Sequence, residues 1–409
     1  MMTNFSKVSV LKTSLILFLV PFLVANLYLV KRSLAQDTPV EKIEVDESKK
    51  ADISKGKEAV TAAKTHELTE SIKWKSMKDL VAEYENLAKQ NPKDPETQYV
   101  LGTGYLLLGD LDKAVSSYQS VLKMRKEPDP WTHLNLGAAY YKKAAYNEAI
   151  KEYNEVLKTV PKSTEAYFNI GIVNRQRGFF NQAISAYKEA VKIDPKFAEA
   201  FYNLGEAYQK KLQNKEAEEA YKETTKIDPE YVNAYSNLGN LYSDQEKFPE
   251  ATDSYKKVLS INPDDAETYY NMGLTCWKQG QENDAEAAYK KAVELKEDFP
   301  EAYNNLGVIY SKRGDRKKSL DMFKKAVKSK PDYVEANFNL GVAYQESKDY
   351  GSALDQFELV LKANPDYAGA YLHRGQVLLE AGKYKRPRKI ISRQLNWIQR
   401  TLSLKNSWL

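Results

Sequence analysis

A glycine recurs at an almost constant interval through most of this 409-residue chain, and this repeat constrains the fold more than any other feature. Each interval is 34 residues, except that the first is 35 because of an extra residue near Glu127 to Asp129. The glycines are Gly102, Gly137, Gly171, Gly205, Gly239, Gly273, Gly307, Gly341 and Gly375. A fixed period of this length is typical of a repeat protein, in which each unit packs on its neighbours.

Three other positions recur in step with the glycine. Twelve residues after it stands a small residue: Ala114, Ala149, Ala183, Ala217, Ala251, Ala285, Ser319 and Ala353. Four residues further on stands an aromatic: Tyr118, Tyr153, Tyr187, Tyr221, Tyr255, Tyr289, Phe323 and Phe357. Most units then end at a proline: Pro161, Pro195, Pro229, Pro263, Pro331 and Pro365.

This pattern predicts pairs of antiparallel helices. A glycine facing an alanine lets two helix backbones approach closely, the aromatic side chain fills the remaining space, and proline prevents the second helix from continuing. One pair cannot bury its own apolar face, whereas stacked pairs can. We therefore predict an all-α solenoid.

The recurring residues resemble the tetratricopeptide repeat family over Pro95 to Ala381. The resemblance implies a right-handed superhelical solenoid similar to the repeats of O-GlcNAc transferase, with eight full units over residues 95–367. A half repeat at residues 72–94 is expected to cap its amino end. Lys126 and Glu297 stand where the family has proline, and Cys276 replaces a tyrosine on a buried helix face, where it is interpreted as a small core residue.

Residues 1–35 contain an almost unbroken apolar stretch from Leu15 to Val30, which ends at Lys31 and Arg32. It could be a signal peptide cleaved after Ala35 or a single membrane anchor, and its length favours the anchor. The protein is therefore expected to be membrane-anchored, or exported or periplasmic after cleavage near Ala35. The polar residues 36–71 carry no helical apolar stripe and are predicted to be a disordered linker.

Residues 368–409 begin as a ninth repeat and then depart from the pattern, with Pro387 in place of the alanine and Ile391 in place of the aromatic. Residues 383–409 hold eight Lys and Arg and no acidic residue. We interpret this segment as a basic C-terminal capping helix. Two alternatives remain open: a cationic amphipathic helix that contacts an anionic membrane or an acidic partner, and an altered gene end.

An asparagine stands two residues before the glycine in seven consecutive units: Asn135, Asn169, Asn203, Asn237, Asn271, Asn305 and Asn339. The family resemblance implies that first helices line a concave surface, so these amides should form a ladder along it. An amide offers donors and an acceptor to the backbone of an extended peptide. The ladder resembles that of O-GlcNAc transferase, which holds substrate peptides, but asparagine could also bridge neighbouring repeats here, and both interpretations stay open.

Large side chains surround the ladder at neighbouring positions of the first helices. Those singled out as candidates for a peptide-binding groove are Tyr141, Phe168, Arg175, Tyr202, Tyr270, Trp277 and Phe338. Aromatic and arginine residues are the anchors that protein interfaces favour. Packing between adjacent first helices accounts for some of them equally well.

Catalysis, cofactors and nucleic acid find no support in the sequence. The three histidines, His66, His133 and His373, are far apart, and the single cysteine cannot form an intramolecular disulfide or a thiolate metal cluster. Outside the basic tail the chain carries 61 − 8 = 53 basic against 56 acidic residues, a net charge of −3, so no basic face for nucleic acid is expected.

We therefore expect a non-enzymatic scaffold that binds an extended peptide in its concave groove, with a protein partner, a membrane contact through the N-terminal segment, and no small-molecule substrate. The alternative is a structural protein that self-assembles or organises an envelope complex through its convex face, for which a homo-oligomer could form.

Overall fold

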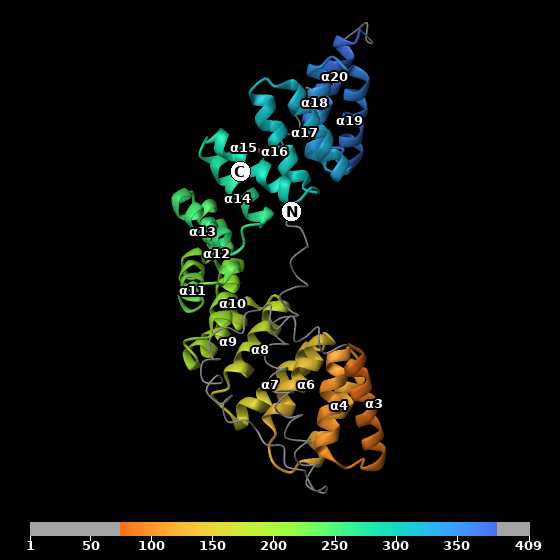
Figure 1. The fold of residues 1–409 in the computed structure, drawn as a ribbon, viewed down its shortest axis with the longest axis vertical. Helices are drawn as coiled ribbons and strands as arrows, with labels where there is room; N and C mark the ends of the chain where they lie inside the picture. The colour runs from red at the N-terminus through yellow and green to blue at the C-terminus, as the bar shows by residue number, and fades with distance from the viewer. Residues whose placement is uncertain (1–73, 383–409) are drawn as a thin grey trace, which may run out of the picture. The chain divides into compact units, whose positions relative to one another are not determined.

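The computed structural model describes residues 74–382, and within this range the chain consists of helices joined by turns, without a β-strand (Figure 1). The helices are α3 (Trp74–Gln90), α4 (Pro95–Leu108), α5 (Leu111–Met124), α6 (Pro130–Lys142), α7 (Tyr146–Thr159), α8 (Thr164–Gln176), α9 (Phe180–Ile193), α10 (Ala198–Lys210), α11 (Asn214–Ile227), α12 (Val232–Asp244), α13 (Phe248–Ile261), α14 (Ala266–Lys278), α15 (Glu282–Leu295), α16 (Pro300–Lys312), α17 (Arg316–Ser329), α18 (Val334–Glu346), α19 (Tyr350–Ala363) and α20 (Ala368–Glu380).

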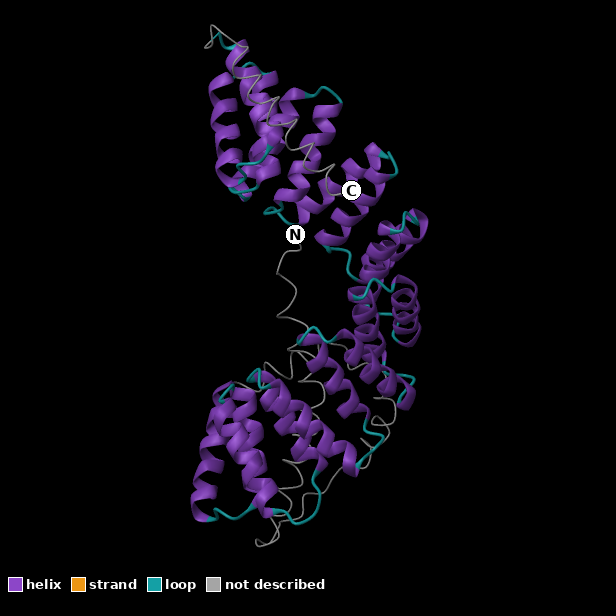
Figure 2. Cartoon of the chain, turned by 180° about the vertical axis from the view of Figure 1, so that it is seen from behind, coloured by secondary structure: helices purple, strands orange, loops and turns teal. Residues whose placement is uncertain are grey.

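The helices are arranged as consecutive pairs. Each even-numbered helix from α4 to α18 packs against the odd-numbered helix that follows it, and each odd-numbered helix from α5 to α19 packs against the first helix of the next pair. Figure 2 shows the described helices from behind, joined by loops. Helix α20 is the first helix of a ninth unit. The prediction of an all-α solenoid of stacked helix pairs is confirmed.

The repeated glycine allows each pair to close. A Cβ atom built at Gly171 would lie 2.4 Å from Cε1 of Tyr187, whose side chain is fully buried. The corresponding distance in the eight pairs from α4 to α19 is between 2.4 and 2.8 Å, so no side chain larger than hydrogen fits without a shift. The sequence argument placed this glycine opposite the alanine, whereas the structure places it directly against the aromatic ring.

The first helix of each described unit is followed, one or two residues after its end, by a residue with a left-handed backbone, seven positions after the repeated glycine. Five of these residues are glycine, but Ala144, Leu212, Glu246 and Lys348 adopt φ values between 58° and 61°. A left-handed conformation costs a residue with a side chain roughly 1 kcal/mol. The turn geometry is therefore the same with or without glycine, which indicates that helix packing determines it.

Proline is not needed to end the second helix. Helix α15 ends at Leu295 although Glu297 stands in the place of proline, and α5 ends at Met124 with Lys126 in that place. In both units the next first helix begins with proline instead, at Pro300 and Pro130. Proline is well suited to the first turn of a helix, where its missing N–H has no partner to lose.

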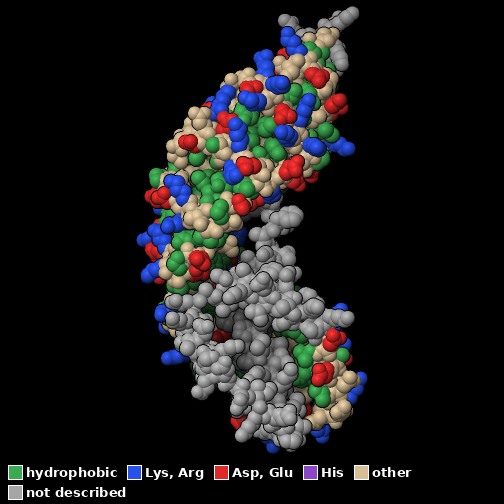
Figure 3. Space-filling model, in the orientation of Figure 1, with side chains coloured by type: hydrophobic (Ala, Val, Ile, Leu, Met, Phe, Trp, Pro, Cys, Tyr) green, Lys and Arg blue, Asp and Glu red, His purple; other side chains and the backbone are tan. Residues whose placement is uncertain are grey.

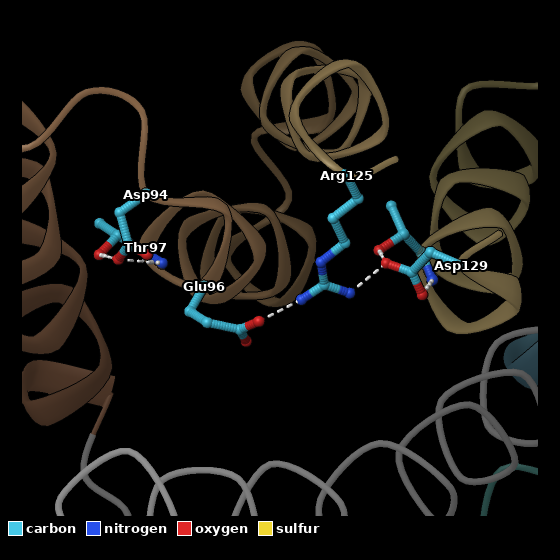
Figure 4. Close-up of polar contacts among 6 residues, drawn as sticks. Asp94, Glu96, Thr97, Arg125 and Asp129 are labelled. Atoms are coloured by element: carbon cyan, nitrogen blue, oxygen red, sulfur yellow. Dashed lines mark hydrogen bonds and ion pairs between the residues drawn. The ribbon is translucent and has the colours of Figure 1, made fainter. Parts of the chain in front are cut away.

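The irregular connection between α5 and α6 is held by Arg125 (Figure 4). Its guanidinium group, just after α5, forms ion pairs with Glu96 of α4 and with Asp129 before α6. Asp129 is 7% exposed and caps α6 by accepting a hydrogen bond from the backbone N–H of Thr132 at 3.1 Å. One arginine thus joins two successive units where the repeat contains its extra residue.

The amino end of the stack is covered by α3. Val81 and Tyr84 of this helix are buried, and the Tyr105 hydroxyl of α4 donates to Oε1 of Glu85 at 2.6 Å. The chain divides into two units, Met1–Ser76 and Met77–Leu409, and the helix pairs belong to the second. The predicted domain boundaries otherwise remain predictions.

The predicted localisation is wrong as far as the structure tests it. None of the helices within residues 74–382 is both long and apolar enough to cross a bilayer. The proposed anchor or signal segment at 1–35 and the linker at 36–71 lie outside the described residues, as does the predicted basic capping helix. We therefore do not retain a membrane-anchored or exported location.

Candidate functional site

The first helices form the inner side of the stack. Successive first helices contact one another directly, as α4 does with α6, α6 with α8, and α16 with α18. Successive second helices within the described residues show no comparable contact. The stack is therefore tighter on the first-helix side, and we call the surface formed by α4, α6, α8, α10, α12, α14, α16, α18 and α20 the inner surface.

Some ladder asparagines bridge neighbouring units. The Asn135 side-chain amide donates to the Tyr99 hydroxyl at 2.7 Å, and Asn237 donates to the Tyr202 hydroxyl at 3.3 Å. In both cases the acceptor lies on the first helix of the preceding unit. Asn237 also donates to the Tyr221 hydroxyl at 3.2 Å, whereas the amide oxygens of both asparagines accept no hydrogen bond from the described residues.

The same bridge occurs towards the carboxyl end. Asn339 donates to Oδ1 of Asn304 in the preceding unit at 2.9 Å. Burial raises the pKa of the Tyr270 hydroxyl, and a hydrogen bond with Asn305 partly offsets the rise, which places Asn305 against the preceding unit as well.

Three ladder residues do not form this bridge. Asn203 is 6% exposed and donates to the carbonyl of Glu199 in its own helix at 2.8 Å. Asn169 and Asn271 are half-buried, and their side chains form no hydrogen bond with any described residue. The ladder thus contains bridging, internal and unbonded amides, which sequence alone could not distinguish.

Four of the candidate anchors are packing residues. Each of Phe168, Tyr202, Tyr270 and Phe338 contacts the aromatic ring of its own second helix and a ring that follows this helix. Ring centroids are 4.7 to 5.9 Å apart in these contacts, which are the distances of favourable aromatic pairs. Phe168 and Tyr202 are buried, so they offer little surface to a partner.

Arg175 is held in an ion pair. Its Nη1 donates to Oε2 of Glu206 on the next first helix at 2.7 Å, and the Tyr202 hydroxyl donates to Oε1 of the same carboxylate at 3.3 Å. Burial alone would lower the pKa of Arg175, but Tyr187 and Glu206 outweigh it and raise the pKa. The ion pair between Arg175 and Glu206 thus links α8 to α10 on the inner surface.

Tyr141 and Trp277 are half-buried on the first helices α6 and α14. The ring of Tyr141 lies 6.0 Å from that of Tyr146, and Nζ of Lys312 lies 5.2 Å from the centre of the Trp277 ring. Trp277 therefore retains surface for a partner beside a positive charge.

Sequence comparison agrees with this architecture. A family model described as the cilia and flagella-associated protein 70 C-terminal domain matches residues 163–370, and a tetratricopeptide repeat model matches residues 105–170. The chain belongs to the tetratricopeptide repeat family. Proteins with this repeat are in general protein-interaction scaffolds.

One solved tetratricopeptide repeat structure shares the fold, and two other solved chains are similar in sequence. The C-terminal part of a repeat protein from Cytophaga hutchinsonii is 18% identical, with a TM-score of 0.51, and the match covers 59% of this chain and 98% of that one. A MamA protein is 31% identical over 41% of this chain and 92% of its own, with a TM-score of 0.39. YrrB, described as having an unusual peptide-binding site, is 24% identical over 49% of this chain and 100% of its own, with a TM-score of 0.39. No curated protein matches the chain.

The repeat array has one feature that the sequence argument missed. One helical turn after three consecutive ladder asparagines stand the apolar residues Leu274, Val308 and Val342, all half-buried. The signal was available as a constant spacing of three residues from Asn271, Asn305 and Asn339. We call Leu274, Val308 and Val342 the apolar stripe.

Charge on the array is mixed. Basic and acidic side chains alternate over the visible face of the last units in Figure 3. On α15, burial would raise the pKa of Glu286, but hydrogen bonds from Lys290, Tyr310 and Arg313 lower it to about 2. The described residues contain no group of three His, Cys, Asp or Glu placed to hold a metal ion.

Proposed function

We propose that this tetratricopeptide repeat protein is a non-enzymatic scaffold that binds an extended segment of another protein on its inner surface. The observation that carries the proposal is the series of seven asparagines on consecutive first helices, in which bridging members such as Asn135 and Asn237 have an amide oxygen that accepts no hydrogen bond from a residue within 74–382. An amide oxygen accepts a hydrogen bond from a backbone N–H, which every residue except proline provides. A row of such acceptors holds an extended chain without reading its sequence.

Bridging does not compete with binding in this proposal. An asparagine side chain has two N–H donors and an oxygen with two lone pairs. Asn135 donates to one hydroxyl and Asn237 to two, and in both residues these bonds use the nitrogen and not the oxygen. The bridge also fixes the rotamer, which lowers the entropy lost when a partner binds.

The ladder can be tested with two pairs of substitutions in the full chain. Asn169→Ala and Asn271→Ala remove amides without hydrogen bonds to described residues, so they should weaken peptide binding and leave the thermal midpoint unchanged. Asn135→Ala and Asn237→Ala should weaken binding and also lower the midpoint, because each breaks a bridge. Asn203→Ala is unsuitable as a first test because this buried amide is bonded within its own helix.

Binding is measured by selecting a displayed library of short random peptides against the wild-type chain and titrating the selected peptides against each variant. The titrations use concentrations at which the chain sediments as a monomer, because self-association would otherwise produce a similar signal. Unchanged affinity in all four variants would show that the ladder amides do not bind the peptide.

A further inference from the structure

The inner surface changes character along the array. At the position of the apolar stripe, three residues after the ladder asparagine, the middle units carry Glu206 and Asn240 instead. The Glu206 carboxylate accepts hydrogen bonds from Arg175 and Tyr202, so this middle section is polar and its charges are paired within the protein. The stripe on α14, α16 and α18 is the longest uninterrupted run of apolar residues at this position.

The stripe lies beside ladder amides. Leu274, Val308 and Val342 each follow a ladder asparagine by three residues, and residues three apart lie on the same helix face. Each side chain is half-buried and packs partly on the core, which fixes its position while leaving apolar surface available. Trp277 extends the apolar surface by one further turn on α14.

The carboxyl end of this section is acidic. Gln345 donates to Glu380 at 3.3 Å and contacts Nδ1 of His373, which occupies the ladder position of the ninth unit, at 2.9 Å. Glu346 is exposed beside this network. Burial lowers the pKa of His373, and the nearby carboxylates of Glu346 and Glu380 partly offset this decrease in pKa. Lys312, at the end of α16, lies over Trp277 of α14. A bound segment therefore meets negative charge at α18 and α20.

The spacing between successive first helices determines which conformation of a bound segment matches the apolar stripe. Helices that pack against each other lie about 8–10 Å apart, and α16 contacts α18 directly. A polyproline II segment advances roughly 9 Å in one turn of three residues, so every third side chain returns to the same face at this step. A β-strand repeats its face about every 6.6 Å and would drift out of register with the stripe.

We infer that α14 to α18 bind an extended protein segment with an apolar side chain at every third position and a Lys or Arg at the end that lies over α18 and α20. The inference rests on the proposed function and adds the chemistry of the partner. The apolar side chains contact the stripe, the ladder amides accept backbone N–H groups, and Glu346 and Glu380 pair with the terminal cation.

Synthetic fluorescent peptides test the spacing directly. The test peptide carries leucine at every third position and ends in lysine, and two peptides of identical composition carry leucine at every second or every fourth position. In fluorescence anisotropy with the full chain, the first should bind at least tenfold more tightly than the other two. Replacing its terminal lysine with glutamate should weaken binding at least fivefold, and the loss should shrink at high salt.

Matched variants locate the site. Val308→Thr and Val342→Thr keep the side-chain volume, add a hydroxyl to the stripe, and should weaken binding of the test peptide. Val327→Thr is the control, because Val327 lies on the second helix α17 and packs on the same core cluster as Val308. Glu346→Gln and Glu380→Gln should remove the preference for lysine over glutamate, whereas Glu358→Gln on α19 should not.

The outcomes separate this inference from the proposed function. If the three leucine spacings bind equally and the affinity still depends on Asn169 and Asn271, the inference fails and the proposed function stands. If no selected or synthetic peptide binds the wild-type chain, or if no asparagine substitution changes the affinity of a peptide that does bind, the proposed function fails. A synthetic peptide of residues 383–409 is included as a competitor, and its displacement of the test peptide at equal concentration would assign the surface to the chain's own segment and overturn the inference.

Discussion

Gly171→Ala should destabilise the repeat array although alanine is the better helix former. In a helix interior alanine is favoured over glycine by about 1 kcal/mol. The new Cβ, however, would lie 2.4, 2.5 and 2.9 Å from three ring atoms of Tyr187, where ordinary carbon contacts are about 3.5–4.0 Å. The ring is fully buried and cannot move aside, so we expect the upper end of the usual overpacking cost of about 1–3 kcal/mol.

The net effect is then a loss of about 2 kcal/mol, which lowers the thermal midpoint by about 4–8 °C at roughly 2–4 °C per kcal/mol. Circular dichroism melts of the full chain measure it. Gly351→Ala is the matched control, because Gly351 is in helix α19 and the nearest atom to its Cβ position is 4.0 Å away, so this substitution should raise the midpoint slightly.

A double substitution identifies the cause. In a Tyr187→Ala background the ring is absent, and Gly171→Ala should become neutral or stabilising. If Gly171→Ala melts at or above the wild-type midpoint while Gly351→Ala behaves as expected, the buried ring does not restrict this position and the packing argument is refuted.

Three other perturbations test separate contacts. Arg125→Ala should lower the free energy of unfolding by about 1–3 kcal/mol, measured by urea denaturation, because it leaves the buried Asp129 without its charged partner. Glu286 has a folded pKa of about 2, below its ordinary 4.5, so its contribution to stability is present above pH 4.5 and is lost as the pH falls towards 2; Glu286→Gln should flatten the fall of the thermal midpoint in this window. Burial raises the pKa of the Cys276 thiol, so a thiol reagent at pH 8 should label it only after denaturant is added.

The sequence predicted the helix pairs because one period recurs through the chain, and each recurrence is an independent indication of the same geometry. It placed the repeated glycine opposite alanine rather than against the aromatic ring, because a repeat pattern gives the spacing of residues along a helix and not the direction in which a side chain leans. The sequence argument also predicted that proline ends the second helix of each unit. Helix α15 ends in the same place without it, since the packing of the next pair already stops the helix.

The candidate site was less predictable than the fold. The ladder positions follow from the sequence, but the partner of each amide depends on what the preceding unit offers: a tyrosine to Asn135, an asparagine to Asn339, and only its own helix to Asn203. The inner aromatics looked like free anchors because their second contacts, such as Phe197 against Phe168, come from the loop after the second helix. An aromatic residue recurs at this loop position in step with the repeat, at Phe197, Tyr231, Phe299, Tyr333 and Tyr367, so the sequence marks these rings but not the contacts that form once the helices pair.

The mixture of bridging and unbonded amides bears on affinity. A side chain that must be immobilised on binding costs about 0.5–1.5 kcal/mol, whereas an amide already fixed by its neighbour avoids much of this cost. Asn135 and Asn237 should therefore contribute more per hydrogen bond than Asn169 and Asn271, even though their donors are partly used. Structural bridging and peptide binding are then two uses of one arrangement, because the contact that stiffens the stack also orients the acceptor that a partner requires.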